Sequence, residues 1–303
     1  MGILSLLNDT ISEWQLYDME KRRQGKINLL KILSRMKPGK DVRTEKLRIG
    51  KIPVLVLRPT VSREKTPALL WIHGGGYFLG MKEMVYMGRA ADLVNKYGIT
   101  VVSPGYRLAF QKPYPAALQD CYRTLVFMKQ HAAVLGIDDD KIMVGGESAG
   151  GGLTAALCML ARDRGTVKIA YQFPLYPMLS NRDTESSRDN HGRVWNTRRN
   201  HLGWWFYLRG NAKKRVSPYA SPIHQKDFSN LPPAYTFVGS GEPFYAETLA
   251  YIQKLTEAGV EAEVDVYPSD CHAFDILDPE SEVSRQAIRT FEEKIEKIVT
   301  CRN

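Results

Sequence analysis

The sequence predicts an α/β protein with a mostly parallel sheet of eight strands and helices on both faces. Short apolar, β-rich segments alternate with helical patterns from residue 45 onward, as in strand–helix–strand units. Several segments, such as KIMVG and ITVVS, are continuous apolar runs, as strands buried on both faces require. The length of 303 residues, with 44% hydrophobic and 25% charged residues, suits one large globular α/β domain.

The expected strands are short apolar runs bounded by polar or turn-forming residues. Their ranges are 47–49, 54–57, 68–72, 100–103, 142–144, 169–173, 235–238 and 262–267. The expected helices repeat apolar residues at spacings of three and four, over 84–96, 116–131, 149–163, 244–258 and 281–299. Three strands come first, and a helix then separates each strand from the next, except between the sixth and the seventh.

Two segments interrupt this alternation. Residues 1–44 carry a helical pattern and are expected to form an N-terminal cap segment, which leaves 45–303 as the main domain. Residues 181–230 are polar, aromatic and irregular, and are expected to form a cap-like insertion. The alternative that both segments only cover the surface stays open, although LGWWFYL is too aromatic to be left wholly in water.

The apolar stretches, the N-terminal sequence and the cysteines indicate in which cellular compartment the protein is expected. No stretch reaches the roughly 18 uninterrupted apolar residues of a membrane span. The N-terminus has no basic region or cleavage site typical of a signal peptide, and Leu6 stands where a myristoylation signal needs Ser or Thr. The cysteines have no metal-ligand spacing and are expected to be reduced thiols: Cys121, Cys158, Cys271 and Cys301. We therefore expect a cytoplasmic protein without a membrane span or a metal site.

The net charge of +9 raises the question of a nucleic-acid partner. The basic residues are dispersed, apart from NTRRN and NAKKR, and no nucleic-acid-binding motif accompanies them. A solvated basic surface explains the charge, and we expect no nucleic acid among the partners.

The stretch KIMVGGESAGGGLTAAL contains a G-x-S-x-G pentapeptide between an expected strand and an expected helix. A serine on such a tight turn is held with its oxygen exposed, and the helix N-terminus beyond it favours negative charge. Gly146 and Gly150 remove Cβ atoms that would clash there. A glycine-rich turn without a role is the alternative, but the strand-to-helix context favours Ser148 as a nucleophile.

The stretch WIHGGGYFLG closes the third expected strand and opens a glycine-rich loop. Attack by a serine on an ester creates an oxyanion, which needs preorganised N–H donors. We expect these donors to be the amides of Gly74 and Gly75, where no side chain blocks close approach, and of Ala149. His73 lies on the wrong loop to act as the base, so it is expected to be a buried, hydrogen-bonded brace.

The base is expected at His272, in YPSDCHAFD, because it follows the last expected strand. Four other histidines are expected at the surface or in packing: His131, His191, His201 and His224. The acid should follow the seventh strand, where Glu242 stands at the strand end and would orient His272. The competing carboxylates are Glu247, Asp270 and Asp275.

The motifs HGGGYFLG, SPGYRLAFQKPYPAALQD, VGGESAGGGLTAAL, GEPFYAETLAYIQKLTEAGV and YPSDCHAFD occur in this order. With them the chain, from about residue 57 to 274, resembles the hormone-sensitive-lipase-like family of α/β-hydrolase carboxylesterases, the acetylesterase and lipase type. The resemblance implies an α/β-hydrolase fold with a helical cap, no cofactor, and hydrolysis of carboxylic esters, usually short-chain ones. It also implies a catalytic role for Ser148, Glu242 and His272, and an oxyanion hole formed by Gly74, Gly75 and Ala149.

The sequence departs from this family pattern at Glu242, where the family usually has Asp; the longer side chain can serve. The other departures are Gly105 for an acidic residue, Phe110 and Gln111 for Pro-Glu, and Gly152 for Asn. Arg107 and Asp120, in the same motif as Gly105, are expected to be structural braces rather than catalytic groups.

These observations predict a serine carboxylesterase that hydrolyses short-chain acyl or acetyl esters of small molecules through an acyl-enzyme. Two alternatives stay open: a catalytically silent small-molecule receptor on the same fold, and an amide or peptide hydrolase. Tyr77 is expected to bind substrate, with core packing as an equal alternative. A homodimer is consistent with such a fold, and the pocket walls that set the physiological substrate are not readable from sequence.

Overall fold

The computed structural model describes residues 37, 41–61, 65–87, 90–209 and 216–300. The predicted N-terminal cap segment, 1–44, lies outside these residues except for 37 and 41–44. The first strand, β1, already begins at Val42.

Eight strands form one sheet, in the order β1-β2-β4-β3-β5-β6-β7-β8. Strand β2 is antiparallel to both of its neighbours, and all other pairs are parallel. The strand bounds are β1 Val42–Ile49, β2 Ile52–Pro59, β3 Thr66–Ile72, β4 Thr100–Pro104, β5 Ile137–Glu147, β6 Tyr171–Leu175, β7 Ala234–Gly239 and β8 Ala262–Tyr267. The predicted fold class, a mostly parallel eight-stranded sheet, is confirmed.

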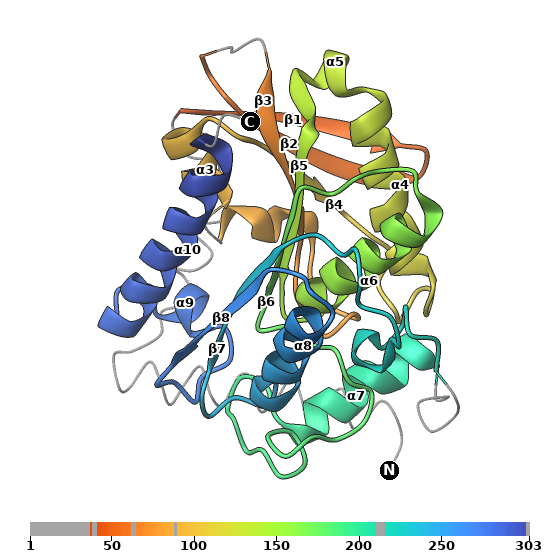
Figure 1. Ribbon diagram of the computed structural model, residues 1–303, viewed down its shortest axis with the longest axis vertical. Helices are drawn as coiled ribbons and strands as arrows, with labels where there is room; N and C mark the ends of the chain where they lie inside the picture. The colour runs from red at the N-terminus through yellow and green to blue at the C-terminus, as the bar shows by residue number, and fades with distance from the viewer. Residues whose placement is uncertain (1–36, 38–40, 62–64, 88–89, 210–215, 301–303) are drawn as a thin grey trace.

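Helices cover both faces of the sheet (Figure 1). One face carries α4 (Ala116–Gln130), α6 (Ala149–Arg164) and α8 (Tyr245–Glu257), and the other carries α3 (Ala90–Tyr97) and α10 (Glu282–Thr300). Alternate strand residues supply the two cores. In β3, Leu70 packs into the first core and its neighbours Leu69 and Trp71 into the second, as the two-residue period of a strand dictates.

Some elements differ from the prediction. The expected helix over 84–96 is divided into a 3-10 helix, η1 (Lys82–Tyr86), and α3. The cap-like insertion is not wholly irregular, because it contains α7 (Thr197–Leu208) and a 3-10 turn, η2 (Pro222–His224). Two short helices were not predicted, α5 (Ala132–Leu135) and α9 (Phe274–Leu277). In the described ranges, every helix is too short or too polar to cross a membrane.

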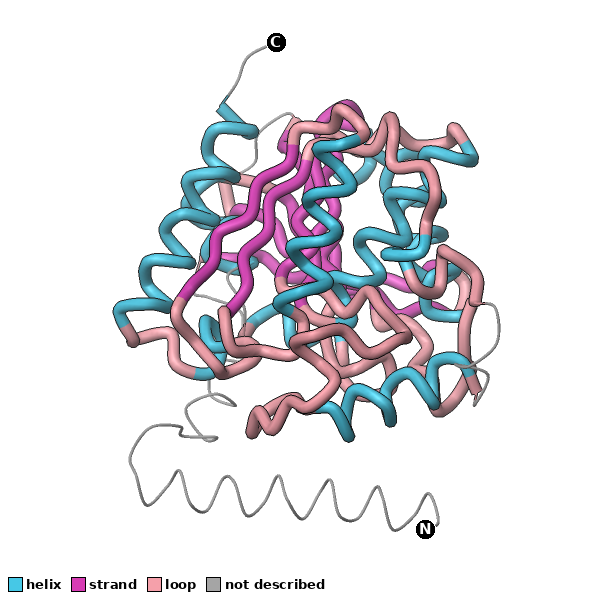
Figure 2. The backbone as a smooth tube through the Cα atoms, turned by 60° about the horizontal axis from the view of Figure 1, so that its bottom comes forward, coloured by secondary structure: helices cyan, strands magenta, loops and turns pink. Residues whose placement is uncertain are grey.

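The loops that follow the parallel strands gather at one end of the sheet. Figure 2 brings this end forward, with α7 and long loops in front of the strands. Ligand sites in open α/β sheets lie at the carboxyl ends of the strands. The candidate residues Gly74, Ser148, Glu242 and His272 all follow such ends, directly after β3, β5, β7 and β8 or within a few residues of them.

Candidate active site

Ser148 stands between the end of β5 and the start of α6 in a strained backbone conformation, with φ 59° and ψ −120°. Its N–H donates to the Leu175 carbonyl oxygen at 3.0 Å, which fixes the turn against β6. A Cβ on Gly150 would overlap the Ile72 carbonyl oxygen and lie 2.7 Å from that of His73. A Cβ on Gly146 would lie 2.7 Å from the Gly150 carbonyl oxygen. The tight turn that the pentapeptide predicted is present, and both glycines are needed for it.

Gly150→Ala is expected to destabilise the fold by about 3 kcal/mol or more, because the added methyl has no space. The matched control is Gly165→Ala at the other end of α6, where a Cβ meets nothing within 4 Å and only the φ of +62° is unfavourable. That strain alone costs roughly 1–2 kcal/mol. Urea denaturation of both variants measures the difference, and equal losses would contradict the close packing around Gly150.

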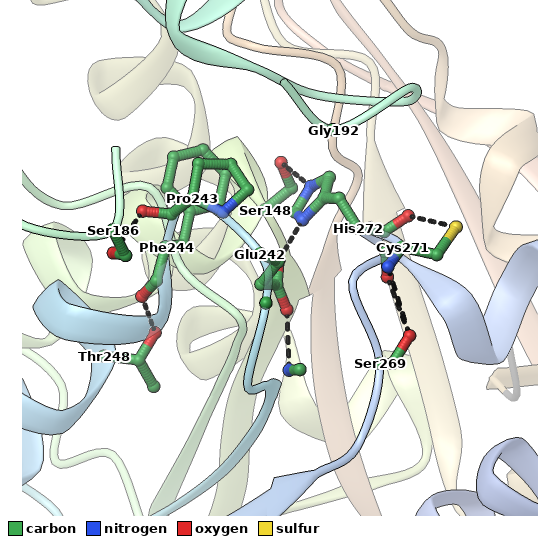
Figure 3. A network of polar contacts seen from close by, with 12 residues as sticks. Ser148, Ser186, Gly192, Glu242, Pro243, Phe244, Thr248, Ser269, Cys271 and His272 are labelled. Atoms are coloured by element: carbon green, nitrogen blue, oxygen red, sulfur yellow. Dashed lines mark hydrogen bonds and ion pairs between the residues drawn. The ribbon is translucent and has the colours of Figure 1, made fainter. Parts of the chain in front are cut away.

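His272 lies between β8 and α9 and joins Ser148 to Glu242 (Figure 3). Its Nε2 is 2.9 Å from Ser148 Oγ, and its Nδ1 is hydrogen-bonded to Glu242 Oε2. With Nδ1–H donating to the carboxylate, Nε2 is free to accept the proton of the serine hydroxyl. The structure therefore brings the predicted nucleophile, base and acid into one hydrogen-bonded chain.

Glu242 is held in place from its other side. Its Oε1 accepts from the Gly239 N–H at 2.9 Å, and its side chain is fully buried. The loop after β7 is tied to the loop after β8, because the Gly241 N–H donates to the Ser269 carbonyl oxygen at 3.0 Å. These backbone contacts set the carboxylate beside His272, so that the imidazole has one preferred orientation.

The rival carboxylates have other surroundings. Glu247 Oε1 accepts from the Leu179 N–H at 2.6 Å, Asp270 is exposed, and Asp275 lies on α9. The other histidines of the prediction also lie away from Ser148. His131 stacks on Phe127, His191 and His201 pair with Asp189 and Asp183, and His224 is exposed.

The glycine loop after β3 lies directly beside Ser148. A Cβ on Gly74 would be 3.3 Å from the Ser148 Cβ and 3.0 Å from the Glu147 carbonyl oxygen. Within the described residues, the amides of Gly74, Gly75 and Ala149 donate no hydrogen bond, and Gly75 has a φ of +111° that favours glycine. N–H groups that are free and next to the nucleophile have the arrangement that an oxyanion requires.

His73 braces this loop, as the sequence indicated. It is fully buried, its Nδ1 donates to the Gly74 carbonyl oxygen at 2.8 Å, and its ring stacks on Tyr106 with centroids 4.2 Å apart. Desolvation by burial lowers its pKa to about 4, so the imidazole is neutral at physiological pH. The Tyr106 hydroxyl donates to the His73 carbonyl oxygen at 2.9 Å, which ties the loop to the segment after β4.

Tyr77 is 1% exposed, and its hydroxyl donates to the Met178 carbonyl oxygen at 2.6 Å. Its ring stacks on Tyr207 of α7, with centroids 4.0 Å apart, and contacts Trp204. This packing favours the alternative of a core role, and the substrate-binding role of Tyr77 stays a prediction. The same contacts attach the insertion over 181–230 to the glycine loop.

Trp195, in the same insertion, was not among the predicted site residues. Its ring packs on Gly76, where an added Cβ would be 2.9 Å from Cζ2, and its centroid is 6.4 Å from that of His272. The Arg199 guanidinium donates to the Val194 carbonyl oxygen at 3.0 Å and so holds the preceding backbone. The only sequence signal was an isolated aromatic residue in a polar segment.

Arg107 and Asp120 form the structural brace expected from their motif. The guanidinium makes two hydrogen bonds of 2.8 Å to the buried carboxylate, which also accepts from the Arg107 N–H at 3.0 Å. The pair joins the segment after β4 to α4, away from the Ser148 chain.

Comparison with known proteins agrees with the geometry. A family profile described as alpha/beta hydrolase fold matches residues 69–276. A carboxylesterase of Mycobacterium tuberculosis is 32% identical over 227 residues, which cover 74% of this chain and 71% of the relative. An arylesterase of Saccharolobus solfataricus is 30% identical over 269 residues, 87% of each chain. Among solved structures, a bacterial heroin esterase matches with a TM-score of 0.83 at 29% identity, over 89% of each chain. The chain belongs to the hormone-sensitive-lipase-like family of α/β-hydrolase carboxylesterases.

Proposed function

We propose that the protein is a serine carboxylesterase that hydrolyses short-chain acyl esters, and the hydrogen-bonded chain Ser148–His272–Glu242 carries this proposal. Ser148 Oγ attacks the ester carbonyl carbon while its proton passes to His272 Nε2. The imidazolium gives that proton to the alcohol oxygen as the bond between this oxygen and the acyl carbon breaks. The alcohol leaves, and the acyl group remains on Ser148.

Water completes the cycle. His272 Nε2 takes a proton from water as the water oxygen attacks the acyl carbon, and Ser148 Oγ leaves with that proton. Glu242 stabilises the imidazolium in both steps through its hydrogen bond to Nδ1. The amides of Gly74, Gly75 and Ala149 hold the oxyanion of each tetrahedral intermediate.

A restricted space at Ser148 supports short acyl groups. The serine is 6% exposed, and Trp195 packs across the glycine loop towards His272. The insertion over 181–230 would then be a cap that sets the size of the pocket. The names of the relatives, carboxylesterase and arylesterase, support an ester rather than an amide as the substrate.

Location in the cytoplasm is part of the proposal. The buried cysteines Cys121 and Cys158 are free thiols, which suits a reducing compartment. A homodimer stays a prediction.

A series of p-nitrophenyl esters from acetate to palmitate tests the proposed function. The expected result is the highest kcat/KM with acetate or butyrate and a steep fall beyond them. An anilide of the preferred acid should react at least about 100-fold more slowly than the ester, because an amide is the harder bond to break. Tight binding of the esters without turnover would instead favour a silent receptor, and equal rates on the anilide would favour an amide hydrolase.

Trp195→Ala is expected to raise kcat/KM for octanoate relative to acetate by about tenfold or more, because the ring no longer limits the space beside Gly76. Trp205→Ala is the matched control, since Trp205 is on the same insertion but 39% exposed and in edge-to-face contact with Phe206. Its octanoate-to-acetate ratio should equal that of the wild type. An unchanged ratio in both variants would remove Trp195 from the pocket wall.

A further inference from the structure

We propose that Glu247 is a positioning residue: its carboxyl group anchors residues 175–180, and this segment fixes Ser148 and the loops around it. The inference rests on the proposed function of Ser148. Glu247 lies in the first turn of α8 and is 1% exposed. It is the second buried glutamate after β7, and the proton-transfer chain does not use it.

In the part of the chain that the structure describes, the polar contacts of the Glu247 carboxyl group go to one segment. Its Oε1 accepts from the Leu179 N–H at 2.6 Å and from the Ser180 N–H at 3.3 Å. Its Oε2 has no hydrogen-bond partner within the described part of the chain. Burying a carboxyl group costs free energy of folding. Here the buried group accepts hydrogen bonds from two backbone N–H groups that would otherwise be unsatisfied.

The anchored segment contacts the site at successive residues. The Leu175 carbonyl oxygen accepts from the Ser148 N–H, and the Met178 N–H donates to the Ser148 carbonyl oxygen, both at 3.0 Å. The rings of Tyr176 and His272 are nearly perpendicular, with centroids 5.2 Å apart. The Met178 carbonyl oxygen accepts from the Tyr77 hydroxyl. Nucleophile, base and glycine loop are therefore all in contact with residues 175–178, which directly precede the two residues bonded to Glu247.

The start of α6 is closely packed against this segment. A Cβ on Gly151 would lie 2.9 Å from both the Leu175 carbonyl oxygen and the Pro177 Cβ. A Cβ on Gly152 would overlap the Met178 carbonyl oxygen. Because the start of α6 packs this closely on the segment, a shift of residues 178–180 must move the turn that carries Ser148. A misplacement of about 1 Å at such a site can reduce turnover about 100-fold.

The carboxyl group of Glu247 is mainly neutral near pH 7. Burial raises its pKa to about 8, the two backbone N–H groups act in the opposite direction, and the carboxylate of Glu242 raises it further. Tyr77 is the other titratable group that interacts with it. Glutamine is therefore a close replica, since it keeps the Oε1 acceptor and lacks a charge.

The test compares Glu247→Ala with Glu247→Gln by kcat, KM, and the rate at which a fluorophosphonate labels Ser148. In Glu247→Ala we expect kcat and the labelling rate to fall about 100-fold with KM changed less than about threefold, because the nucleophile is displaced. In Glu247→Gln both rates should stay within about threefold of the wild type, because Oε1 still accepts from Leu179 and Ser180. Should the Ala variant not fold, Glu247→Asp, which withdraws the acceptor by one methylene, should lose at least about tenfold in both rates.

Glu292→Ala is the matched control for loss of a buried carboxylate. Glu292 lies on α10, is 8% exposed and binds Lys96 through both oxygens, away from Ser148. This variant should melt at a lower temperature with kcat within about threefold of the wild type. All rates are measured at a temperature where circular dichroism shows each variant folded.

A pH series adds a readout of the charge. The unfolded chain loses the Glu247 proton near its ordinary pKa of 4.5, whereas the folded protein keeps it to about pH 8. The folded state binds more protons in this range, so stability falls as pH rises from about 5 to 8. The melting temperature of Glu247→Gln should therefore exceed that of the wild type by an amount that grows over this range to about 5 °C or more.

Three results would overturn the proposal: wild-type rates in a folded Glu247→Ala, equal losses in the Ala and Gln variants, or a pH-independent difference in melting temperature. A wild-type protein that is rapidly labelled at Ser148 but hydrolyses no ester would overturn the proposed function instead. The labelling rates would then still decide the role of Glu247.

Discussion

Ser148→Ala is expected to lower kcat on short-chain esters by a factor on the order of 10⁵, because it removes the atom to which the acyl group is transferred. The loss should fall on kcat, since binding of the ester does not need the serine oxygen. Among the described residues, the Ser148 side chain has one hydrogen-bond partner, His272 Nε2, so the substitution leaves the backbone contacts of the turn intact. We therefore expect a folded protein with a melting temperature close to that of the wild type. Steady-state kinetics with p-nitrophenyl acetate measures the fall in kcat, and mass spectrometry after fluorophosphonate treatment shows whether the protein can still be labelled. Thermal denaturation measures the melting temperature.

Ser103→Ala is the control for this experiment. Ser103 is also a fully buried serine at the end of a strand, β4, but its Oγ donates to the Lys82 carbonyl oxygen at 3.1 Å. This variant should keep its activity and be labelled at Ser148 at the wild-type rate. A Ser148→Ala enzyme within tenfold of the wild type would show that another group performs the attack.

The parts of the site that depend on local sequence could be predicted. Gly146 and Gly150 stand at a fixed spacing around Ser148, and the close approach of their backbone to Ile72 permits no side chain there. Gly74 and Gly75 follow β3 for a similar reason. The pairing of Ser148 with His272, 124 residues later, followed from the order of strand ends rather than from any local pattern.

The start of β5 and helix α7 were not predicted, because both carry polar residues in buried or half-buried positions. Strand β5 begins at Ile137, whereas the sequence predicted a start at 142. The first part of the strand was missed because the acidic residues after Ile137 are half-exposed and give no apolar pattern. Helix α7 buries Arg199 and Asn200 among its aromatic residues, which removes the apolar period from the sequence. In the structure the Asn196 side chain caps the start of α7 and accepts from the Arg199 N–H at 3.0 Å.

The sequence favoured Glu242 over Glu247 as the acid, but it indicated no role for Glu247. Both follow β7 and both are buried in the structure. What distinguishes them is the partner that each carboxyl group meets, His272 for one and the Leu179 backbone for the other. Those partners come from segments distant in the chain, so only the folded arrangement reveals them.

Glu242→Gln is expected to lower kcat/KM by about 10³–10⁴-fold, the loss that follows when a triad acid no longer orients its histidine. The amide oxygen can replace Oε1 and still accept from the Gly239 N–H, so the loop after β7 stays in place. The amide nitrogen then stands where Oε2 accepts from His272 Nδ1, and it can only donate. To accept that bond, Nδ1 must lose its proton to Nε2, and an Nε2–H cannot take the proton of Ser148.

The comparison of Glu242→Gln with Glu247→Gln isolates this effect, because the two variants make the same replacement in neighbouring buried carboxyl groups. Glu242→Gln should lose activity and Glu247→Gln should not. Of these two carboxyl groups, that of Glu242 is hydrogen-bonded to His272, whereas that of Glu247 is bonded to the Leu179 backbone. Glu242→Asp keeps the charge but shortens the reach to Nδ1, and an activity between those of the wild type and the Gln variant is expected. If the two Gln variants lose activity equally, neither carboxyl group is distinguished as the acid, and the assignment of Glu242 fails. If Glu242→Gln retains full activity, the imidazole is oriented by another group and the two-step mechanism must be assigned a different acid.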